Sequence, residues 1–467
     1  MEPKTRQKQL QHLYLRAGFG EDPHFIQEHR DQSIAWHVDR LFRNSQSGRP
    51  LDYLKDPTKG GRKRVGGLRL VGLFLKSRRQ LRKLNLHWVR RIVTTQAVLR
   101  ERMTLFWHDH FATHVPLAIL MERQNQTLRE SALEKFGPLL HAIAKDPAML
   151  IYLNNQQNVK DHPNENFARE VMELFTLGEG HYTEVDIKEA ARAFTGWTTD
   201  RSGNFQFDAE KHDFGEKTVL GVSGKLTGEQ VIDILLDQKQ TARYLCRKLY
   251  RYFVNDHVDP ERLEQLTERY FRTGFDTGDL LRHIFTAEWF YAEVNRGALI
   301  KGPVDLIVHC MRILKAEYPR NFLFLAVQEA LGQVLFFPPN VAGWSGGRSW
   351  IDSATLMLRM KLPLVVFGAD EFDLELKPEI EAMGTDISSQ RIPRYFKARA
   401  EWRHLAKSVS GIPDDQLHEA IIAALIQCPD VNIDRKNLLS FADSTSKIEL
   451  IKSLTLRVMA LPEFQLK

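Results

Sequence analysis

The chain has 467 residues, a formal net charge of +6, and hydrophobic, charged and aromatic contents of 43%, 27% and 10%. These values are close to the averages of globular proteins and exclude wholesale disorder and collagen-like repeats. The three cysteines, Cys246, Cys310 and Cys428, are widely spaced, so we expect buried thiols and not a disulfide scaffold. No stretch approaches the ~18 apolar residues needed to cross a bilayer, and no signal peptide is visible, so we expect a soluble, cytoplasmic chain.

Apolar residues recur at helical spacing over most of the chain, beginning with residues 9–16. A second helix is expected after Asp22-Pro23, and a long amphipathic helix over about 71–111. Thr183 and Asp186 form a predicted capping box for a helix that Gly196 ends. Further helical patterns cover 128–145, 164–177, 184–195, 228–255, 260–272, 277–292, 303–316, 322–334, 353–366 and several stretches after 395.

Two segments depart from the helical pattern. Alternation of Phe205 with Phe207, and later of Leu220 with Val222, predicts a small β-hairpin at about 204–224. The stretch 336–350 contains two prolines and three glycines, which predicts an ordered loop or lid. We therefore expect a mainly α protein. A large multi-helix domain, residues 1–370, would carry the inserted hairpin, and a helical C-terminal subdomain, residues 371–467, would follow a boundary near 370–392.

The basic residues are unevenly distributed along the chain. Between residues 55 and 100 there are fourteen Lys or Arg and one acid, Asp56, so this basic segment carries +13 and the remainder −7. Such a segment attracts polyanions such as nucleic acid, acidic polysaccharide or anionic lipid. The alternative is a helix surface whose arginines pair with acids of the same chain. The leucines interleaved with the arginines favour this alternative.

The first polar cluster is the FWHDHF run, residues 106–111, at the end of the predicted long helix. At 100° per residue His110 lies on the face of Met103 and Phe106, and His108 lies nearly opposite. A buried histidine must be hydrogen-bonded, charged by a carboxylate or bound to a ligand. Since a lone inward histidine is more often a satisfied core residue, both interpretations of His110 stay open.

The second polar cluster lies in the predicted helix 164–177. Glu165, Arg169 and Glu173 recur at four-residue spacing, Glu170 lies beside them, and Thr176 continues the polar stripe. Three carboxylates around one arginine could hold a divalent metal or divide acid and base roles. The alternative is an i,i+4 ion pair between Glu165 and Arg169 on a solvated face, which the spacing alone favours.

Two further polar clusters are expected on turns. His181 and Tyr182 lie on a glycine-flanked turn, where loops often carry function. His212, Asp213 and Lys217 lie in the predicted hairpin turn, although such residues are also ordinary in turns. The sequence has no H-E-x-x-H or paired C-x-x-C zinc spacing, and no Walker A, G-x-G-x-x-G or G-x-S-x-G motif.

Taken together, these motifs resemble the large bacterial domain-of-unknown-function family 1800. The resemblance covers roughly residues 10 to 360 and rests on HLYLRAGFG (12–20), FWHDHF (106–111), residues 164–197, HDFGEKTVLG (212–221) and FFPPNVAGWSGG (336–347). Many members resemble exported proteins, often encoded beside a sulfatase-like or phosphatase-like family. This chain begins almost at the first motif, so export is not expected. The resemblance implies that the polar motif residues form a site, but it implies no reaction.

Our leading hypothesis is a hydrolase-like enzyme, metal-assisted or based on carboxylate and histidine groups, where the FWHDHF helix meets the 164–177 helix. Its candidate catalytic residues are His110, Glu165, Arg169, Glu170, Glu173, His181, His212 and Asp213, and its candidate metal ligands are His108, His110, Glu165, Glu170 and Glu173. A divalent metal is the candidate cofactor, because a cation offsets the cost of gathering carboxylates. Arg169 would orient an anionic substrate, and the 339–347 loop would cover the cleft.

The alternative hypothesis is a non-catalytic binding or assembly protein. In it the basic segment 55–100 contacts an acidic polymer or a partner protein. The polar motifs would then form buried ion pairs that specify the fold. No RRM, zinc-finger or helix-turn-helix signature is present, so dedicated nucleic-acid binding is not expected.

Overall fold

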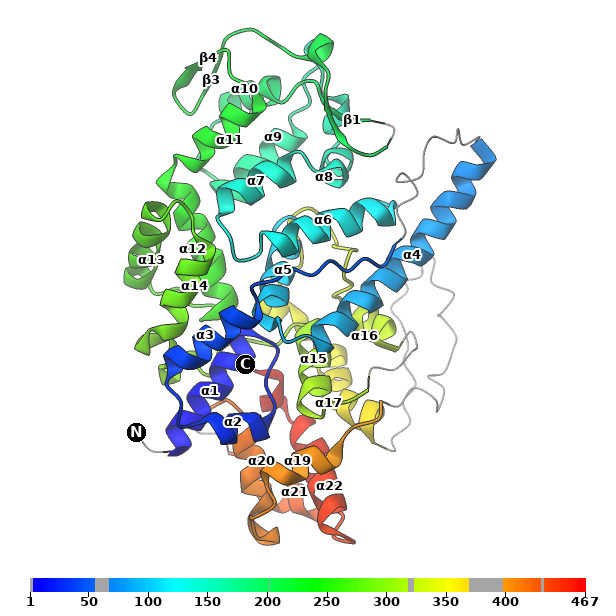
Figure 1. Ribbon diagram of the computed structural model, residues 1–467, viewed down its shortest axis with the longest axis vertical. Coiled ribbons are helices and arrows are strands. Elements are labelled where there is room, and N and C mark those ends of the chain that lie inside the picture. Colours follow the sequence, from blue (N-terminus) through cyan, green and yellow to red (C-terminus); the bar gives the residue numbers. More distant parts are fainter. Residues whose placement is uncertain (1–2, 55–66, 201, 318–322, 369–397, 430–431) are drawn as a thin grey trace.

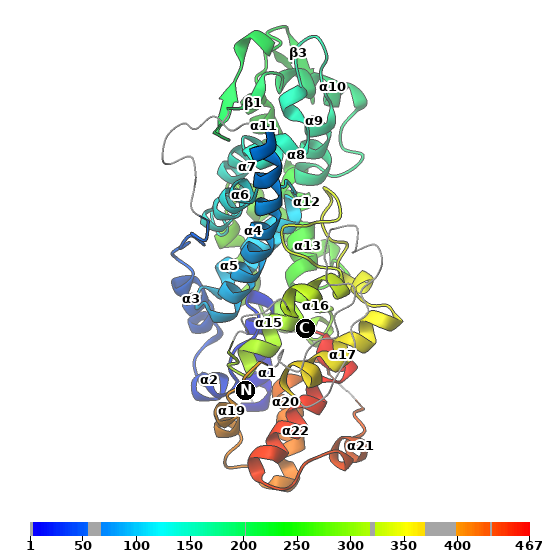
Figure 2. The same ribbon diagram turned by 90° about the vertical axis from the view of Figure 1, so that its right-hand side faces the viewer.

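The computed structural model describes residues 3–54, 67–200, 202–317, 323–368, 398–429 and 432–467. The protein is elongated and mainly α-helical (Figures 1 and 2), which confirms the predicted fold class. The first part of the basic segment, residues 55–66, and the whole of the predicted boundary near 370–392 lie outside the described residues. The division into domains 1–370 and 371–467 therefore stays a prediction.

The predicted long helix over 71–111 is two helices, α4 and α5. Between them the Thr95 hydroxyl accepts the Ala97 N–H at 3.0 Å, a local turn that competes with the helix. The helices up to residue 200 are α1 (Pro3–Ala17), α2 (Pro23–His29), α3 (Ile34–Asn44), α4 (Gly67–Thr94), α5 (Val98–His110), α6 (Ala118–Glu130), α7 (Phe136–Ala144), α8 (Pro147–Tyr152), α9 (Asn166–Glu170) and α10 (Glu184–Ala193), with a 3-10 turn at Asn155–Gln157. The predicted capping box of Thr183 and Asp186 is confirmed at the start of α10.

The helix predicted over 164–177 changes type midway. After α9 the chain continues as a π-helix, η3 (Val171–Thr176). A π turn contains more residues than an α turn, so later residues leave the stripe that a 3.6-residue period predicts. Thr176, which was expected on the polar stripe, is buried instead, and its hydroxyl donates to the Val171 carbonyl at 2.7 Å.

The predicted strand region forms two antiparallel hairpins at one end of the molecule (Figure 1). β1 (Trp197–Thr199) pairs with β2 (Phe205–Phe207), and β3 (Lys217–Val219) pairs with β4 (Val222–Gly224). The small inserted hairpin is thus confirmed, although Phe205 pairs backward with Thr199 and not with the later strand. Leu220 and Gly221, between β3 and β4, both have positive φ, as a two-residue type I′ turn requires.

The remaining helices build the middle and the opposite end of the molecule. They are α11 (Gly228–Leu236), α12 (Lys239–Phe253), α13 (Pro260–Arg272), α14 (Thr277–Thr286), α15 (Pro303–Ile313), α16 (Leu323–Leu331), α17 (Ser353–Phe367), α19 (Trp402–Ser408), α20 (Leu417–Leu425), α21 (Arg435–Ser440) and α22 (Lys447–Met459), with 3-10 turns at Ala209–Lys211, Glu288–Tyr291, Glu293–Asn295, Gly347–Trp350, Asp414–Gln416 and Pro462–Gln465. The stretch 336–350 is irregular apart from its last four residues, as predicted. No described helix is long and apolar enough to span a membrane.

Two apolar cores hold the described helices together. The first is formed by α1, α3, α5, α7 and the consecutive helices α9 through α14. The second is formed by α4, α6, the helices α15 through α17 and the helices α19 through α22. Helix α5 contributes to both, through Phe106 to the first and Leu105 to the second. Cys246 and Cys310 are buried thiols as expected, whereas Cys428 is only partly buried. The helices after residue 398 thus share their core with α4 and with α15 to α17.

Arg16, in the first motif, is buried where several distant segments meet. Its guanidinium donates to the carbonyls of Phe253, Val254, Asn295 and Lys467 at distances between 2.6 and 3.1 Å. The backbone of Lys467 in turn pairs with that of Leu299, through an N–H···O bond in each direction. One side chain therefore joins α1 to the end of α12 and to the last segment of the chain.

Replacing Arg16 by methionine tests this junction. The variant keeps a long side chain but leaves the buried carbonyls of Phe253, Val254 and Asn295 without their donor, and each unsatisfied group costs about 1–3 kcal/mol. The backbone oxygen of Lys467 keeps the N–H of Leu299. We expect the free energy of unfolding to fall by at least about 3 kcal/mol, measured by denaturant unfolding. The control is Arg6→Met on the same helix, where the arginine has one 3.4 Å hydrogen bond to Gln9. Equal losses in the two variants would contradict the account.

Candidate functional site

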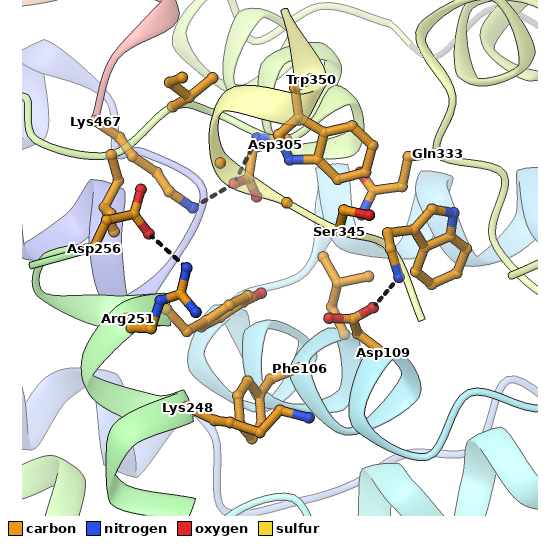
Figure 3. Close-up of a pocket in the computed structure, with 18 of the residues that line it drawn as sticks. Phe106, Asp109, Lys248, Arg251, Asp256, Asp305, Gln333, Ser345, Trp350 and Lys467 are labelled. Atoms are coloured by element: carbon orange, nitrogen blue, oxygen red, sulfur yellow. Dashed lines mark hydrogen bonds and ion pairs between the residues drawn. The ribbon is translucent and has the colours of Figure 1, made fainter. Parts of the chain in front are cut away.

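A cavity of about 240 Å³ lies between α5, α12, α15 and the loop that ends at Trp350 (Figure 3). It has room for about eight water molecules, which suits a small ligand of monosaccharide or amino-acid size. The lining combines charged and aromatic side chains: Asp109, Lys248, Arg251, Asp256, Asp305, Gln333 and Lys467, with Phe106, Tyr252, Trp344 and Trp350. Convergent polar groups in a cavity with aromatic walls are the usual features of a small-molecule site.

Asp109 is the carboxyl group that the α5 helix presents to this cavity. It lies on the last turn of α5, within the FWHDHF run, and its Oδ1 accepts the backbone N–H of Trp344 at 2.8 Å. Burial raises the pKa of Asp109 to about 6, against the opposing effects of that N–H and of Lys248. The cavity wall therefore contains a carboxyl that can exchange a proton near neutral pH.

The two histidines beside Asp109 fix the orientation of this turn. His108 Nε2 accepts the N–H of Phe336 at 3.0 Å, and His110 Nε2 donates to the carbonyl of Phe175 at 3.2 Å. Burial lowers the pKa of His108 to about 3 and the pKa of His110 well below its usual range, so both rings are neutral at physiological pH. They attach α5 to the 336–350 loop and to η3, and Asp109 is left facing the cavity.

The same loop packs directly on Asp109 because one of its residues has no side chain. Gly343 has a φ of +79°, and a Cβ there would lie 2.6 Å from the Asp109 carbonyl oxygen. Glycine alone permits both this conformation and this approach. The next residue, Trp344, is thereby placed with its N–H on the carboxylate. The 342–347 part of the loop forms one wall of the cavity.

Lys248 is a cation of the same cavity whose charge acts on Asp109. It lies on α12, one turn before Tyr252, and its Nζ is 5.5 Å from the centre of the Tyr244 ring. Among the described residues Lys248 has no hydrogen bond or ion pair. Burial lowers the pKa of Lys248 to about 8, and the Asp109 carboxylate opposes this effect. Between about pH 6 and pH 8 the cavity therefore holds an ionised Asp109 and a protonated Lys248.

The pKa of Asp305, at the start of α15, is shifted in the opposite direction from the pKa of Asp109. Burial alone would raise its pKa, but ion pairs with Arg102 and Lys467 lower the pKa of Asp305 well below its usual range. Arg102 also donates from Nε to the Gly18 carbonyl at 2.7 Å and lies over the Phe19 ring. Asp305 is therefore permanently ionised and fixed. Two carboxyls in one cavity whose pKa values are driven apart are a pattern of acid–base sites.

The corner of the cavity beside Asp305 also contains neutral donors and acceptors (Figure 3). A Cβ at Gly302 would lie 3.2 Å from Gln333 Oε1 and 3.8 Å from Trp350 Nε1, so both side chains reach the same point. Gln333 Oε1 already accepts the Val304 N–H at 3.0 Å. At the mouth, Arg251 and Asp256 form a loose, exposed ion pair of 3.8 Å (Figure 3). A bound ligand could compete for this arginine.

The predicted carboxylate cluster of the 164–177 helix lies outside the cavity lining. Arg169 pairs with Glu165 at 3.2 Å and with Glu184 at 2.7 Å, with about a third of its side chain exposed. Glu173 accepts the Tyr182 hydroxyl hydrogen, and Glu170 is half-buried, where burial and then Glu173 raise its pKa. The Glu165–Arg169 pair is thus the solvated i,i+4 ion pair that the spacing favours.

The two turn clusters also lie away from the cavity lining. His181 is exposed. His212 is buried and donates from Nδ1 to the Thr195 carbonyl at 2.8 Å, while Asp213 pairs with Arg192 at 2.7 Å. Figure 1 shows β3, which follows these residues, at the end of the molecule remote from α15. His212 and Asp213 thus bond to residues at and just after the C-terminal end of α10, next to the two β-hairpins.

The proposed metal ligands do not gather around one point. His108 and His110 bond to backbone groups on different segments, and Glu165, Glu170 and Glu173 belong to the partly exposed face described above. In the part of the chain that the structure describes, no three His, Cys, Asp or Glu side chains are arranged to hold a metal ion. Metal binding by this set therefore has no support from the geometry.

Sequence reasoning missed the residues that do converge. Asp109 lies between the two histidines of the FWHDHF run, and its helix places it on the side of Leu105 and Phe106. The spacing of Asp109 from Leu105 and Phe106 on the helix could therefore have indicated that the three side chains share a face. Lys248 and Asp305 lie in ordinary amphipathic helices outside the motifs. Only the packing of α12 and α15 against α5 brings them together.

The fold and the cavity define a mainly helical protein in which two of the sequence motifs, 106–111 and 336–347, contribute residues to a candidate acid–base site. The chain belongs to the family described as "Protein of unknown function (DUF1800)", whose model matches residues 12–466. This confirms the resemblance inferred from the motifs and extends it through the C-terminal helices. No curated protein and no solved structure matches the chain.

The raised pKa of Asp109 has a measurable effect on stability. The folded chain holds the proton up to about pH 6, whereas an ordinary aspartate releases it near 3.8, so stability falls as pH rises between these values. The Asp109→Asn variant has no ionising carboxyl at this position, so its free energy of unfolding does not fall for this reason as pH rises. We expect its stability relative to wild type to increase by at least about 1 kcal/mol from pH 5 to pH 8, measured by thermal unfolding.

The control for this experiment is Asp237→Asn, at an exposed carboxylate on the surface. Its stability relative to wild type should show no such trend. A pH-independent difference between Asp109→Asn and wild type would show that Asp109 has an ordinary pKa, which would contradict the described site.

Proposed function

We propose that the chain is a hydrolase-like acid–base enzyme and that Asp109 is its catalytic carboxyl. One observation carries the proposal: Asp109 and Lys248 line one cavity, and burial shifts the pKa of each group toward neutral pH while their mutual attraction opposes both shifts. A base is most effective when its pKa is close to the working pH, because it is then ionised and still basic. Strongly shifted pairs in a cavity favour a functional role.

The roles of the two groups follow from their charges. Asp109 would take a proton from a water molecule as the water oxygen attacks the electrophilic carbon or phosphorus of the substrate. The protonated Lys248 would stabilise the negative charge that develops on the substrate oxygen. Protonated Asp109 would then return its proton to the leaving group, so the net reaction consumes one water and leaves both side chains as they began.

The remaining cavity residues would bind and orient the substrate. Arg251, loosely paired at the mouth, could accept an anionic group of the substrate. Trp350 Nε1 and Gln333 offer a donor and an amide at the inner corner. His108 and His110 are positioning residues in this proposal, because their hydrogen bonds fix the turn that carries Asp109. The reaction needs no group from the Glu165, Glu170 and Glu173 face.

A panel of p-nitrophenyl esters, phosphates and glycosides tests the proposal. We expect hydrolysis of at least one class, with kcat/KM rising through about pH 6 as Asp109 ionises and falling through about pH 8 as Lys248 loses its proton. Asp109→Asn should lower kcat by about 10²- to 10⁴-fold. His181→Ala, at an exposed residue outside the cavity, should retain the wild-type rate. Full activity in Asp109→Asn would contradict the assignment.

A matched pair of variants at Lys248 tests the coupling between the two groups. Lys248→Met removes the positive charge that opposes the rise in the Asp109 pKa, so the acid limb of the pH profile should move to higher pH. Lys248→Arg keeps the charge and should leave the acid limb nearly in place. An acid limb at the same pH in both variants would show that Lys248 does not act on Asp109.

A further inference from the structure

Helix α4 presents a row of basic side chains on its outer surface. Arg79, Lys83 and Arg90 are exposed, and their spacing of four and seven residues places them within about 40° of one another over about 16 Å of helix. We call these three residues the basic stripe. In Figure 2 α4 lies in front of α5 and α6, and no described element covers its outer side. Arg49 and Arg78, also exposed, add to the positive charge.

The charges of the basic stripe are not neutralised within the described part of the chain. Its three residues make no side-chain hydrogen bond or ion pair there, whereas Arg91 on the same helix turns toward the body and lies 3.6 Å from Glu101. Two acids on the neighbouring segments have other partners, and a third, Glu329 on α16, interacts with Arg82, which is not part of the stripe. Glu101 pairs with Arg129 at 2.9 Å, and Glu122 accepts the Tyr53 N–H at 2.7 Å. Internal pairing, the alternative considered for the whole basic segment, therefore does not apply to the stripe.

We propose that the basic stripe binds a linear acidic polysaccharide, carboxylated or sulfated. A straight row of flexible point charges matches a chain whose anionic groups lie along its outside. Helix α4 is packed on the body and cannot enter the major groove of DNA as a free helix. Trp88 on the same helix is buried, and the exposed ring of Tyr53 already lies against the ring of His87 on α4, with 4.8 Å between the ring centroids. The proposal is independent of the reaction proposed for the cavity.

The test compares two triple variants of the full chain with the same loss of charge. One is Arg79→Gln, Lys83→Gln and Arg90→Gln in the stripe. The matched control is Lys188→Gln, Lys225→Gln and Arg247→Gln, at exposed residues on other elements. The probes are heparin, polygalacturonate and a double-stranded DNA fragment, each titrated at several NaCl concentrations.

We expect wild type and control to bind heparin or polygalacturonate alike, and the stripe variant to bind at least tenfold more weakly at 50 mM NaCl. The slope of log Kd against log salt should fall by about three in the stripe variant, because each lost cation removes about one. Equal affinity of the two triple variants, or no binding of either polysaccharide by wild type, would overturn the proposal. Tighter binding of DNA than of both polysaccharides would overturn it in favour of a nucleic-acid surface. Thermal unfolding of each variant shows whether it is folded.

Discussion

The cavity depends on a buried ion cluster in which Asp305 contacts both Arg102 and Lys467. These charges are tolerated in the interior because each has a partner, and removing one member would leave another charge buried alone. The cluster joins the first motif, through Gly18 and Arg102, to α5, α15 and the last segment of the chain. Arg16 also joins the first motif to the last segment of the chain, and to the end of α12, through backbone oxygens. The rear wall of the cavity is therefore fixed before any ligand arrives.

Against this fixed wall, Asp109 is the carboxyl group that remains free to change its protonation state. Asp305 is satisfied by two cations, whereas Asp109 receives one backbone N–H and the more distant charge of Lys248. The difference in partners separates the two pKa values. An ion-paired carboxylate and a carboxyl with a raised pKa thus share one small cavity. The histidines that flank Asp109 serve this arrangement by staying neutral and holding the turn between two other segments.

Much of the fold could be predicted from local patterns, because they act over a few residues. The capping box of Thr183 and Asp186 and the irregular 336–350 stretch are examples. The π-helix after Glu170 could not be predicted from such patterns. Its extra residue per turn shifts the helical phase of the polar stripe, and Thr176 is therefore buried.

The site was only partly predictable for a different reason. One sequence motif includes the turn of α5 that carries Asp109, but residue type drew attention to the histidines. Their partners are backbone groups of Phe336 and Phe175, which no spacing rule reveals. The effect of Lys248 on Asp109 arises from helix packing across the core. Spacing did correctly favour the Glu165–Arg169 ion pair.

The most direct test of the central claim is a ¹³C NMR titration of protein labelled at the aspartate carboxyl carbons, compared with Asp109→Asn. The account predicts a resonance with a midpoint near pH 6 that is missing from the variant. If every resonance that the variant loses titrates near the ordinary value of 3.8, Asp109 is not the proton-exchanging group of the cavity.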